Sequence, residues 1–203
     1  MAHKKYQSMQ IIEEFRRSGQ KELLDKYRFK HNGETEYGKI NDFNLQNRID
    51  LVLELFRNYS IKDKPLIRWI LKQEIRCANK ISISIASLEL CAFMLYKVMT
   101  LEDIYLLYKA KFGNTYDNSF ELDVELIFGF DRELTKQFLK NTETKKKKSK
   151  VILKMIKGYE KRCKDNPEAF KSRTEYINYF ENRKSINLIR ELRACLEHLL
   201  NEN

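Results

Sequence analysis

Histidine and cysteine, the residues most used in metal sites and in nucleophilic catalysis, are few and scattered in this chain. The three histidines (His3, His31 and His198) lie in the N-terminal tail, in a loop and in the last predicted helix. None has a partner at the spacing of a metal motif such as HExxH. GxSxG, the Walker loop and GxGxxG are also missing from the sequence. The sequence therefore predicts a protein that is not an enzyme and that needs no metal or cofactor.

One group of carboxylates could do chemistry. Asp117, Glu121, Asp123 and Glu125 lie within nine residues, which would suit a site for a hard cation or an acid/base pair. However, the segment lacks the alternating DxDxDG pattern of a calcium-binding loop. On a helix, Glu121 and Glu125 would share one face while Asp123 points elsewhere. We therefore expect a solvated acidic face.

Lysines form the most distinctive pattern. Nine of them fall within residues 145–164: Lys145, Lys146, Lys147, Lys148, Lys150, Lys154, Lys157, Lys161 and Lys164. The last five are spaced by four, three, four and three residues, so a helix would align them in one stripe. The stripe would lie opposite the predicted apolar face of the same helix, which holds Val151, Ile152, Met155, Ile156, Tyr159 and Cys163.

This lysine stripe has two interpretations. It could bind a phosphate backbone through counterion release. It could equally be a solvated linker and helix face that keeps the protein soluble. No arginine or aromatic pattern for reading bases accompanies the stripe in sequence, which favours the linker. Tyr176, Tyr179 and Phe180 could stack on bases, but a helical core explains them equally well.

The four cysteines (Cys77, Cys91, Cys163 and Cys195) lie far apart and mostly at apolar positions of predicted helices. They indicate free, buried thiols in a reducing compartment. No signal-peptide core follows Met1, and no apolar run reaches the length of a membrane span. We therefore expect a cytoplasmic protein without a membrane partner.

Composition and charge limit the fold and the partners. Two prolines and six glycines in 203 residues favour long helices, and a hydrophobic fraction of 42% excludes wholesale disorder. The net charge of +10 is uneven, since residues 142–203 carry 16 basic and 9 acidic groups. A basic excess confined to one segment points to a partner of that segment.

These side chains must be positioned by helices, and one helix organises the rest. Residues 88–99 hold only two charged groups, Glu89 and Lys97. A helix that is apolar on nearly every side needs neighbours on every side, so we place it at the centre of a helical pack. Ser82 or Ser84 is expected to cap its start.

Apolar periodicity predicts further helices on both sides of the central one. The first predicted face holds Leu45, Ile49, Val52, Leu53 and Phe56. The second follows Pro65 and holds Leu66, Ile67, Ile70, Leu71, Ile75 and Ala78. A third face follows Thr100, which starts a capping box. Residues 120–128 fit both a strand and a helix, and we favour the helix because a lone strand pair is marginal. Asp131 starts the next helix, and three amphipathic helices fill residues 151–203, the second opened by Pro167 and the third capped by Ser185.

The predicted helix pairs begin near residues 45, 84 and 119, a period typical of stacked two-helix repeats. From Leu88-Glu-Leu-Cys-Ala-Phe-Met-Leu-Tyr-Lys, through Leu101-Glu-Asp-Ile-Tyr-Leu-Leu-Tyr, to Leu122-Asp-Val-Glu-Leu-Ile-Phe-Gly, the chain resembles a bacterial family of HEAT-like helical-repeat proteins of unsettled function. The resemblance covers residues 65–141. It implies stacked helices and carries no catalytic residue.

The predicted fold is all-α, with stacked antiparallel helix pairs in an α-solenoid and a C-terminal helical portion. Four parts are expected: N-terminal helices and a loop (1–44), a helical-repeat body (45–141), a lysine-rich linker (142–150) and basic helices packed on the body (151–203).

The favoured function is a non-catalytic scaffold that binds another macromolecule, with a protein as the first choice. A bacterial toxin-immunity or conflict-system component is one instance of such a scaffold. The alternative is sequence-independent binding of nucleic acid through residues 145–164.

Overall fold

A computed structural model describes residues 2–33, 42–80, 85–113, 121–166 and 169–201. The described residues form an all-helical fold, as predicted, without a named strand. Its α-helices are α1 (Ala2–Ser18), α2 (Leu45–Arg57), α3 (Lys64–Ala78), α4 (Ala86–Lys97), α5 (Ile104–Phe112), α6 (Glu125–Phe128), α7 (Arg132–Asn141), α8 (Lys146–Arg162), α9 (Arg173–Tyr179) and α10 (Ser185–Asn201). Short 3-10 segments precede α3 and α5 (Ile61–Asp63 and Leu101–Asp103), and a longer one spans Lys21–Tyr27.

The central helix is α4, as its apolar sequence predicts. Every residue from Ala86 to Tyr96 is buried, including the charged Glu89. Helices α2, α3, α5 and α10 all pack against it. The predicted cap by Ser82 or Ser84 lies outside the described residues, and the backbone enters the helix at Ile85 without a side-chain cap.

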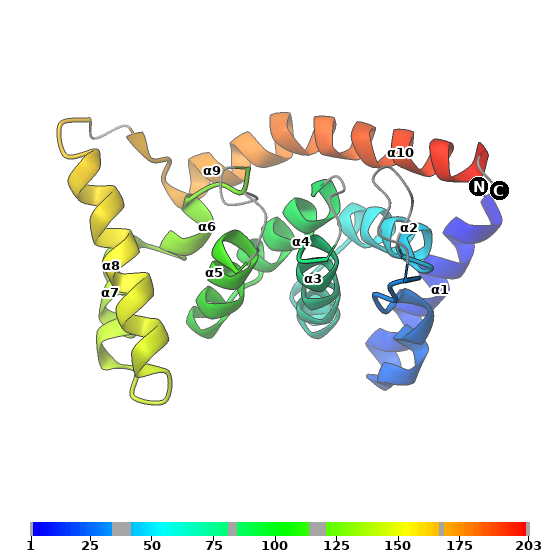
Figure 1. Ribbon diagram of the computed structural model, residues 1–203, viewed down its shortest axis with the longest axis horizontal. Coiled ribbons are helices and arrows are strands. Elements are labelled where there is room, and N and C mark those ends of the chain that lie inside the picture. The colour runs from blue at the N-terminus through cyan, green and yellow to red at the C-terminus, as the bar shows by residue number, and fades with distance from the viewer. Residues whose placement is uncertain (1, 34–41, 81–84, 114–120, 167–168, 202–203) are drawn as a thin grey trace.

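The helices pack as consecutive pairs that follow one another along the molecule (Figure 1). Along this row, packing is most extensive between α1 and α2, α3 and α4, α5 and α6, and α7 and α8. The predicted pairs would instead have joined α2 with α3 and α4 with α5. The predicted pairing is wrong, because every pair starts one helix earlier than expected. The first pair begins with α1, not with α2.

The same packing crosses two of the predicted boundaries. Helix α1 packs on α2 across residue 44, and α7 packs on α8 across the expected linker. Residues 146–150 are not a linker, because they form the start of α8. This stretch holds no apolar residue, and its contact with the body is made by Ser149. Ser149 is buried, and its Oγ lies 2.7 Å from the hydroxyl oxygen of Tyr105.

Capping boxes start two helices of the row in the same way. The side chains of Ser60 and Thr100 each cap the 3-10 turn that leads into α3 or α5. In turn, the carboxylates of Asp63 and Asp103 accept the backbone N–H of Ser60 and Thr100. Each aspartate also binds an arginine of the preceding odd-numbered helix. Arg16 Nε of α1 lies 2.6 Å from Asp63 Oδ1, and Arg68 Nε of α3 lies 2.5 Å from Asp103 Oδ1.

The segment at 120–128 differs from its prediction. Within its described part, residues 121–124 are not helical, and only Glu125–Phe128 is helical. Gly129 then adopts φ +70°, where a Cβ would lie 2.5 Å from Thr135 Oγ1. Asp131 caps α7 as predicted, because its side chain accepts from the backbone N–H of Glu133 and Leu134.

The C-terminal helices are continuous. Ser172 caps α9, a π-helical turn (Phe180–Lys184) follows, and α10 continues to Asn201. Ser185 does not start a helix as predicted, because it is buried within this run and its hydroxyl donates to Glu181 O at 2.9 Å. We call residues 173–201 the C-terminal helix. It runs across the top of the row and ends near the N-terminus (Figure 1). The prediction for Pro167 lies outside the described residues.

Candidate functional site

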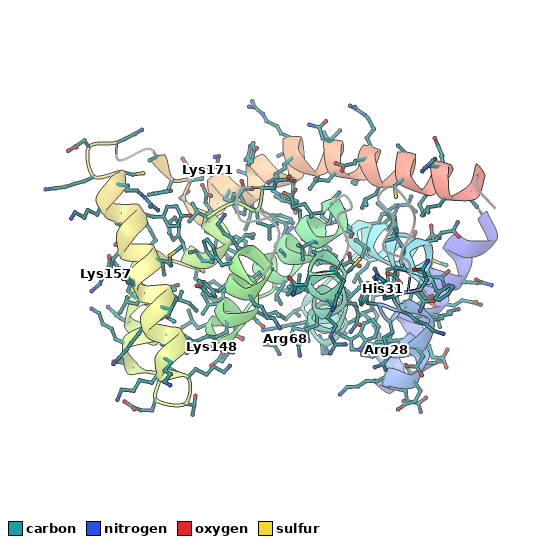
Figure 2. All side chains as sticks on the ribbon, viewed as in Figure 1. Arg28, His31, Arg68, Lys148, Lys157 and Lys171 are labelled. Carbon is teal, nitrogen blue, oxygen red and sulfur yellow. The ribbon has the colours of Figure 1, made fainter. Side chains whose placement is uncertain are left out.

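The lysine stripe lies on α8, at the end of the row of helices. All nine lysines of residues 145–164 are exposed. Lys150, Lys154, Lys157 and Lys161 are helical, and Lys164 follows just after the helix ends. Figure 2 shows Lys157 pointing away from the body, whereas Lys148 projects toward the side where α5 lies. The structure therefore aligns the stripe predicted from its spacing and separates Lys148 from it.

Two of these lysines have partners. Lys146 Nζ lies 3.4 Å from Glu143 Oε2, and Lys145 Nζ lies 4.3 Å from the ring centroid of Tyr105. The other seven form no ion pair or ring contact with any described residue. The helix is held by Ile152 and Ile156, which are buried, whereas Val151 is 49% exposed. Ile152 and Ile156 are thus buried as predicted, and Val151 is the member of the predicted apolar face that is exposed.

The predicted acidic cluster does not assemble as a solvated face. Asp117 lies outside the described residues, and Glu121 is exposed. Asp123 Oδ2 lies 2.8 Å from Lys184 Nζ and accepts the hydroxyl of Tyr176 at 3.0 Å. Buried Glu125 accepts the backbone N–H of Lys171 at 3.2 Å. These carboxylates therefore hold the C-terminal helix on the body.

Lys184 also reaches the central helix. Its Nζ lies 2.5 Å from Glu89 Oε2 and 3.1 Å from the carbonyl oxygen of Glu121. Burial raises the pKa of Glu89 to about 7, because desolvation outweighs the attraction of Lys184, and Asp123 and Glu121 add repulsion. The signal in the sequence was Glu89 itself, a charged residue within an otherwise apolar helix.

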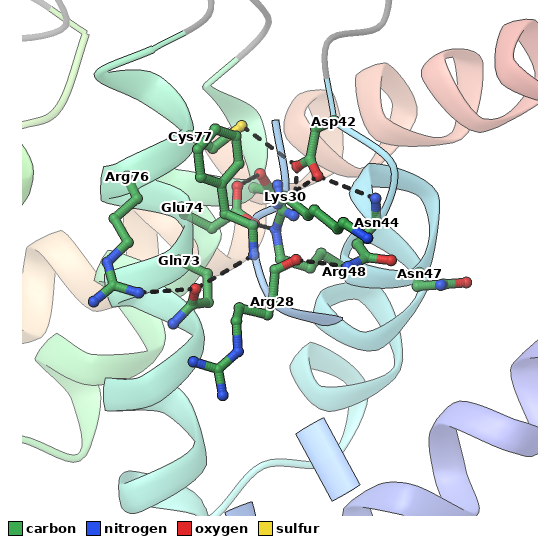
Figure 3. A network of polar contacts seen from close by, with 12 residues as sticks. Arg28, Lys30, Asp42, Asn44, Asn47, Arg48, Gln73, Glu74, Arg76 and Cys77 are labelled. Carbon is green, nitrogen blue, oxygen red and sulfur yellow. Dashed lines mark hydrogen bonds and ion pairs between the residues drawn. The ribbon is translucent and has the colours of Figure 1, made fainter. Parts of the chain in front are cut away.

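A second buried network surrounds Arg48 of α2 (Figure 3). Arg48 is fully buried; its Nη1 lies 2.5 Å from Asp42 Oδ2, and its Nε lies 2.6 Å from Glu74 Oε1. Ser87 of α4 donates to Glu74, and Asp42 also accepts the backbone N–H of Lys30 and Asn44, each at 3.0 Å. The network ties the chain before α2 to α2, α3 and α4.

Arg48 remains charged in this network. Although burial acts to lower it, the neighbouring Glu74, Cys77 and Asp42 raise the pKa of the guanidinium. The sequence signal for this site was an arginine three residues after Leu45 and one before Ile49, on the apolar face of α2. The predicted face omitted Arg48, so sequence analysis missed the network.

Histidines and cysteines form no cluster in the described parts of the chain, where no group of three or more His, Cys, Asp or Glu could hold a metal ion. The four cysteines are free; Cys77 and Cys91 are buried, and Cys163 and Cys195 are half-buried. His31 lies in an isolated bridge with Asp42.

Comparisons with protein-family models, curated proteins and solved structures found no match to this chain. Among the described helices, none combines the length and apolar character that crossing a bilayer requires.

Proposed function

We propose that the protein is a non-catalytic helical scaffold that binds nucleic acid through the lysine stripe of α8, without regard to base sequence. The observation that carries this proposal is the lack of partners for the stripe: its five lysines are exposed and form no ion pair with any described residue. Cations left without counter-charges on a packed helix are available to phosphates.

Two of the acidic groups that flank the stripe are engaged elsewhere. Glu160 of α8 lies 2.9 Å from Lys136 of α7, and Glu143 pairs with Lys146. Within the helix, the stripe runs from Lys150 to Lys161, a rise of about 16 Å at the spacing of an α-helix. Such a length spans several phosphates of one strand. Contact through lysine alone supplies affinity and position without base readout.

We further propose that the row of helix pairs is solenoid-like, in the manner of the HEAT-like family that residues 65–141 resemble. The repeated link from an arginine of one odd-numbered helix to the capping aspartate of the next supports this arrangement. In stacked repeats each unit contacts mainly its neighbours, and each of these links joins one pair of helices to the next. The row would then hold α8 rigidly at its end.

A protein partner is the second candidate. It is favoured by Phe130, which precedes the cap of α7, and by Leu134 in the first turn of α7; they are 40% and 53% exposed. Exposed apolar side chains suit a partner held by burial, and such binding should change little with ionic strength. A bacterial toxin or another conflict-system protein would be a partner of this kind.

Anisotropy of labelled nucleic acid, measured from about 50 to about 200 mM salt, tests the first candidate. The stripe variant carries Lys150, Lys154, Lys157, Lys161 and Lys164 changed to Gln. A control variant with the same loss of charge carries five exposed lysines from elsewhere changed to Gln: Lys21, Lys62, Lys72, Lys80 and Lys109.

We expect wild type and control to bind with a steep salt dependence. The stripe variant should bind weakly, with the slope of log K against log salt reduced by about 4 on duplex DNA. Equal binding by the two variants would refute the stripe as the site. Nucleic-acid binding by wild type that does not change with salt would argue against phosphate contacts. It would favour an apolar binding surface, as in the second candidate.

A further inference from the structure

A groove runs beside α9, at the junction of the C-terminal helix with α6 and α7. It consists of two adjoining hollows, of about 440 and 860 Å³, which share Phe170, Lys171 and Glu175 as lining residues. Both volumes fall within the range of ligand sites in proteins. Figure 2 shows Lys171 beside the start of the C-terminal helix.

Arginine and aromatic rings line the first hollow. The guanidinium of Arg132 lies 5.6 Å from the ring centroids of both Phe128 and Phe170. It forms no ion pair with a described residue. Arg173, in contrast, is committed to the fold, because its Nη2 donates to the carbonyl oxygens of Tyr96 and Lys97 at 2.9 and 3.2 Å.

Cations, an aromatic ring and amides line the second hollow. Lys171 Nζ lies 4.6 Å from the ring centroid of Tyr179 and 4.0 Å from Glu125 Oε1. Arg183 is exposed and has no ion pair in the described parts of the chain. The amides of Asn178 and Asn182 line the same wall and are exposed. The hollow therefore offers charge, a stacking surface and hydrogen-bonding groups together.

The groove begins where the lysine stripe ends. Tyr159 of α8 makes an edge-to-face contact with Phe170 at 6.2 Å, and the guanidinium of Arg162 lies 4.5 Å from the Tyr159 ring. Lys161 and Tyr159 point to different sides of α8, but Arg162, which follows Lys161, reaches the Tyr159 ring, so a strand that passes around the C-terminal end of α8 would meet Phe170 next. The stripe has no arginine or aromatic pattern in sequence, but the folded protein places Arg162, Tyr159 and Phe170 near the C-terminal end of its helix.

We propose that this groove holds unpaired nucleotides of a nucleic acid whose backbone lies on the lysine stripe. Bases stack on aromatic and guanidinium planes whatever their identity, and asparagine amides can bond to base edges. Glu125, Asp131 and Glu175 also line the groove, so phosphates must lie toward Arg183 and Lys171. Glu175 Oε2 accepts the backbone N–H of Ser172 at 2.7 Å, and its other oxygen can accept an exocyclic amine. The inference rests on the proposed function and adds that the preferred ligand carries single-stranded nucleotides.

The test compares three labelled probes: a blunt duplex, the same duplex with a single-stranded tail, and the tail alone. The groove variant combines Arg132→Gln, Tyr179→Leu and Arg183→Gln. A charge-matched control combines Arg190→Gln and Arg193→Gln, two exposed arginines of α10 outside the groove. Circular dichroism and thermal melting confirm that each variant folds.

We expect wild type and control to bind the tailed duplex about tenfold more tightly than the blunt duplex, the gain of stacking about one base. The groove variant should lose this gain and bind the blunt duplex as wild type does. Equal binding of tailed and blunt duplex by wild type, or a gain that the groove variant keeps, would overturn the groove while the stripe proposal stands.

The probe that consists of the single-stranded tail alone tests whether the groove binds nucleic acid without the stripe. If no duplex binds but the tail binds wild type and not the groove variant, the groove holds single strands without the stripe, and the proposed function fails in its stated form. If none of the three probes binds, both proposals are wrong.

Discussion

The ring of Phe180 lies parallel to that of Phe93, with centroids 3.9 Å apart and 3° between the ring planes. Phe93 belongs to the central helix, and Phe180 is the first residue of the π-helical turn. Both are buried. A π turn inserts an extra residue into the helix and so changes the direction of the side chains that follow. Here Phe180 and Lys184 both reach α4, one by stacking and one by its ion pair with Glu89.

Phe180→Ala should therefore loosen the C-terminal helix. We expect a loss of about 3–5 kcal/mol in the free energy of unfolding, because a large buried ring leaves a cavity. Urea unfolding measures the loss, and protease cleavage within residues 185–201 should increase. Phe180→Leu, which keeps most of the volume, should cost less than about 1.5 kcal/mol. Equal effects of the two changes would contradict this role of the ring.

The stability of the protein should fall as pH rises from about 4.5 to about 7 through the titration of Glu89. The pKa of Glu89 is raised from 4.5 to about 7 in the folded state, so the folded state binds the extra proton in this window. Because the unfolded state binds fewer protons there, raising the pH favours unfolding. The full effect is on the order of 3 kcal/mol.

Glu89→Gln should flatten this pH dependence, as measured by urea unfolding at several pH values. Its stability should match wild type near pH 4.5, where the folded carboxyl is protonated, and exceed it at pH 8. Glu143→Gln, at an exposed residue, is the control and should leave the curve unchanged. A wild-type slope retained in Glu89→Gln would show that another group titrates.

Arg48→Met should destabilise the protein by roughly 3–5 kcal/mol, because Asp42 and Glu74 would remain buried without their counter-charge. Urea unfolding measures this loss. Arg57→Met is the control, since Arg57 pairs with Glu54 while 44% of its side chain is exposed, and it should cost less than about 1 kcal/mol. Adding Asp42→Asn and Glu74→Gln to Arg48→Met should restore much of the stability. A triple variant as unstable as the single one would argue against uncompensated charge as the cause.

The cysteines should react with a thiol reagent in two groups. Burial raises the pKa of Cys77 and Cys91, so these two should react only on unfolding. Cys163 and Cys195 are half-buried and should react in the native protein, with Cys195 slowed because burial raises its pKa as well. Mass spectrometry of timed samples assigns each site. Early modification of Cys77 would contradict its burial.

The helices themselves could be predicted from the sequence where one face is apolar. The six apolar positions of α3 that periodicity named are all buried: Leu66, Ile67, Ile70, Leu71, Ile75 and Ala78. Helix α4 was placed at the centre from its lack of charge. The alignment of the lysine stripe followed from its spacing alone. Local pattern is sufficient for these features because a helix's own period determines which of its residues share a face.

The pairing of the helices and the roles of the buried charges were decided by tertiary structure. Periodicity states that a face is buried but does not name the element that covers it, so the pairing was wrong by one helix. Lys184 meets Asp123 across 61 residues of sequence, and Arg48 meets Glu74 across 26. Ser185 has the residue type of a helix cap, yet the contacts of Phe180 and Lys184 with α4 favour a continuous helix through a π turn. The fold also placed Phe170, with Arg132 over its ring, against Tyr159 near the C-terminal end of α8, and no local pattern predicts this proximity.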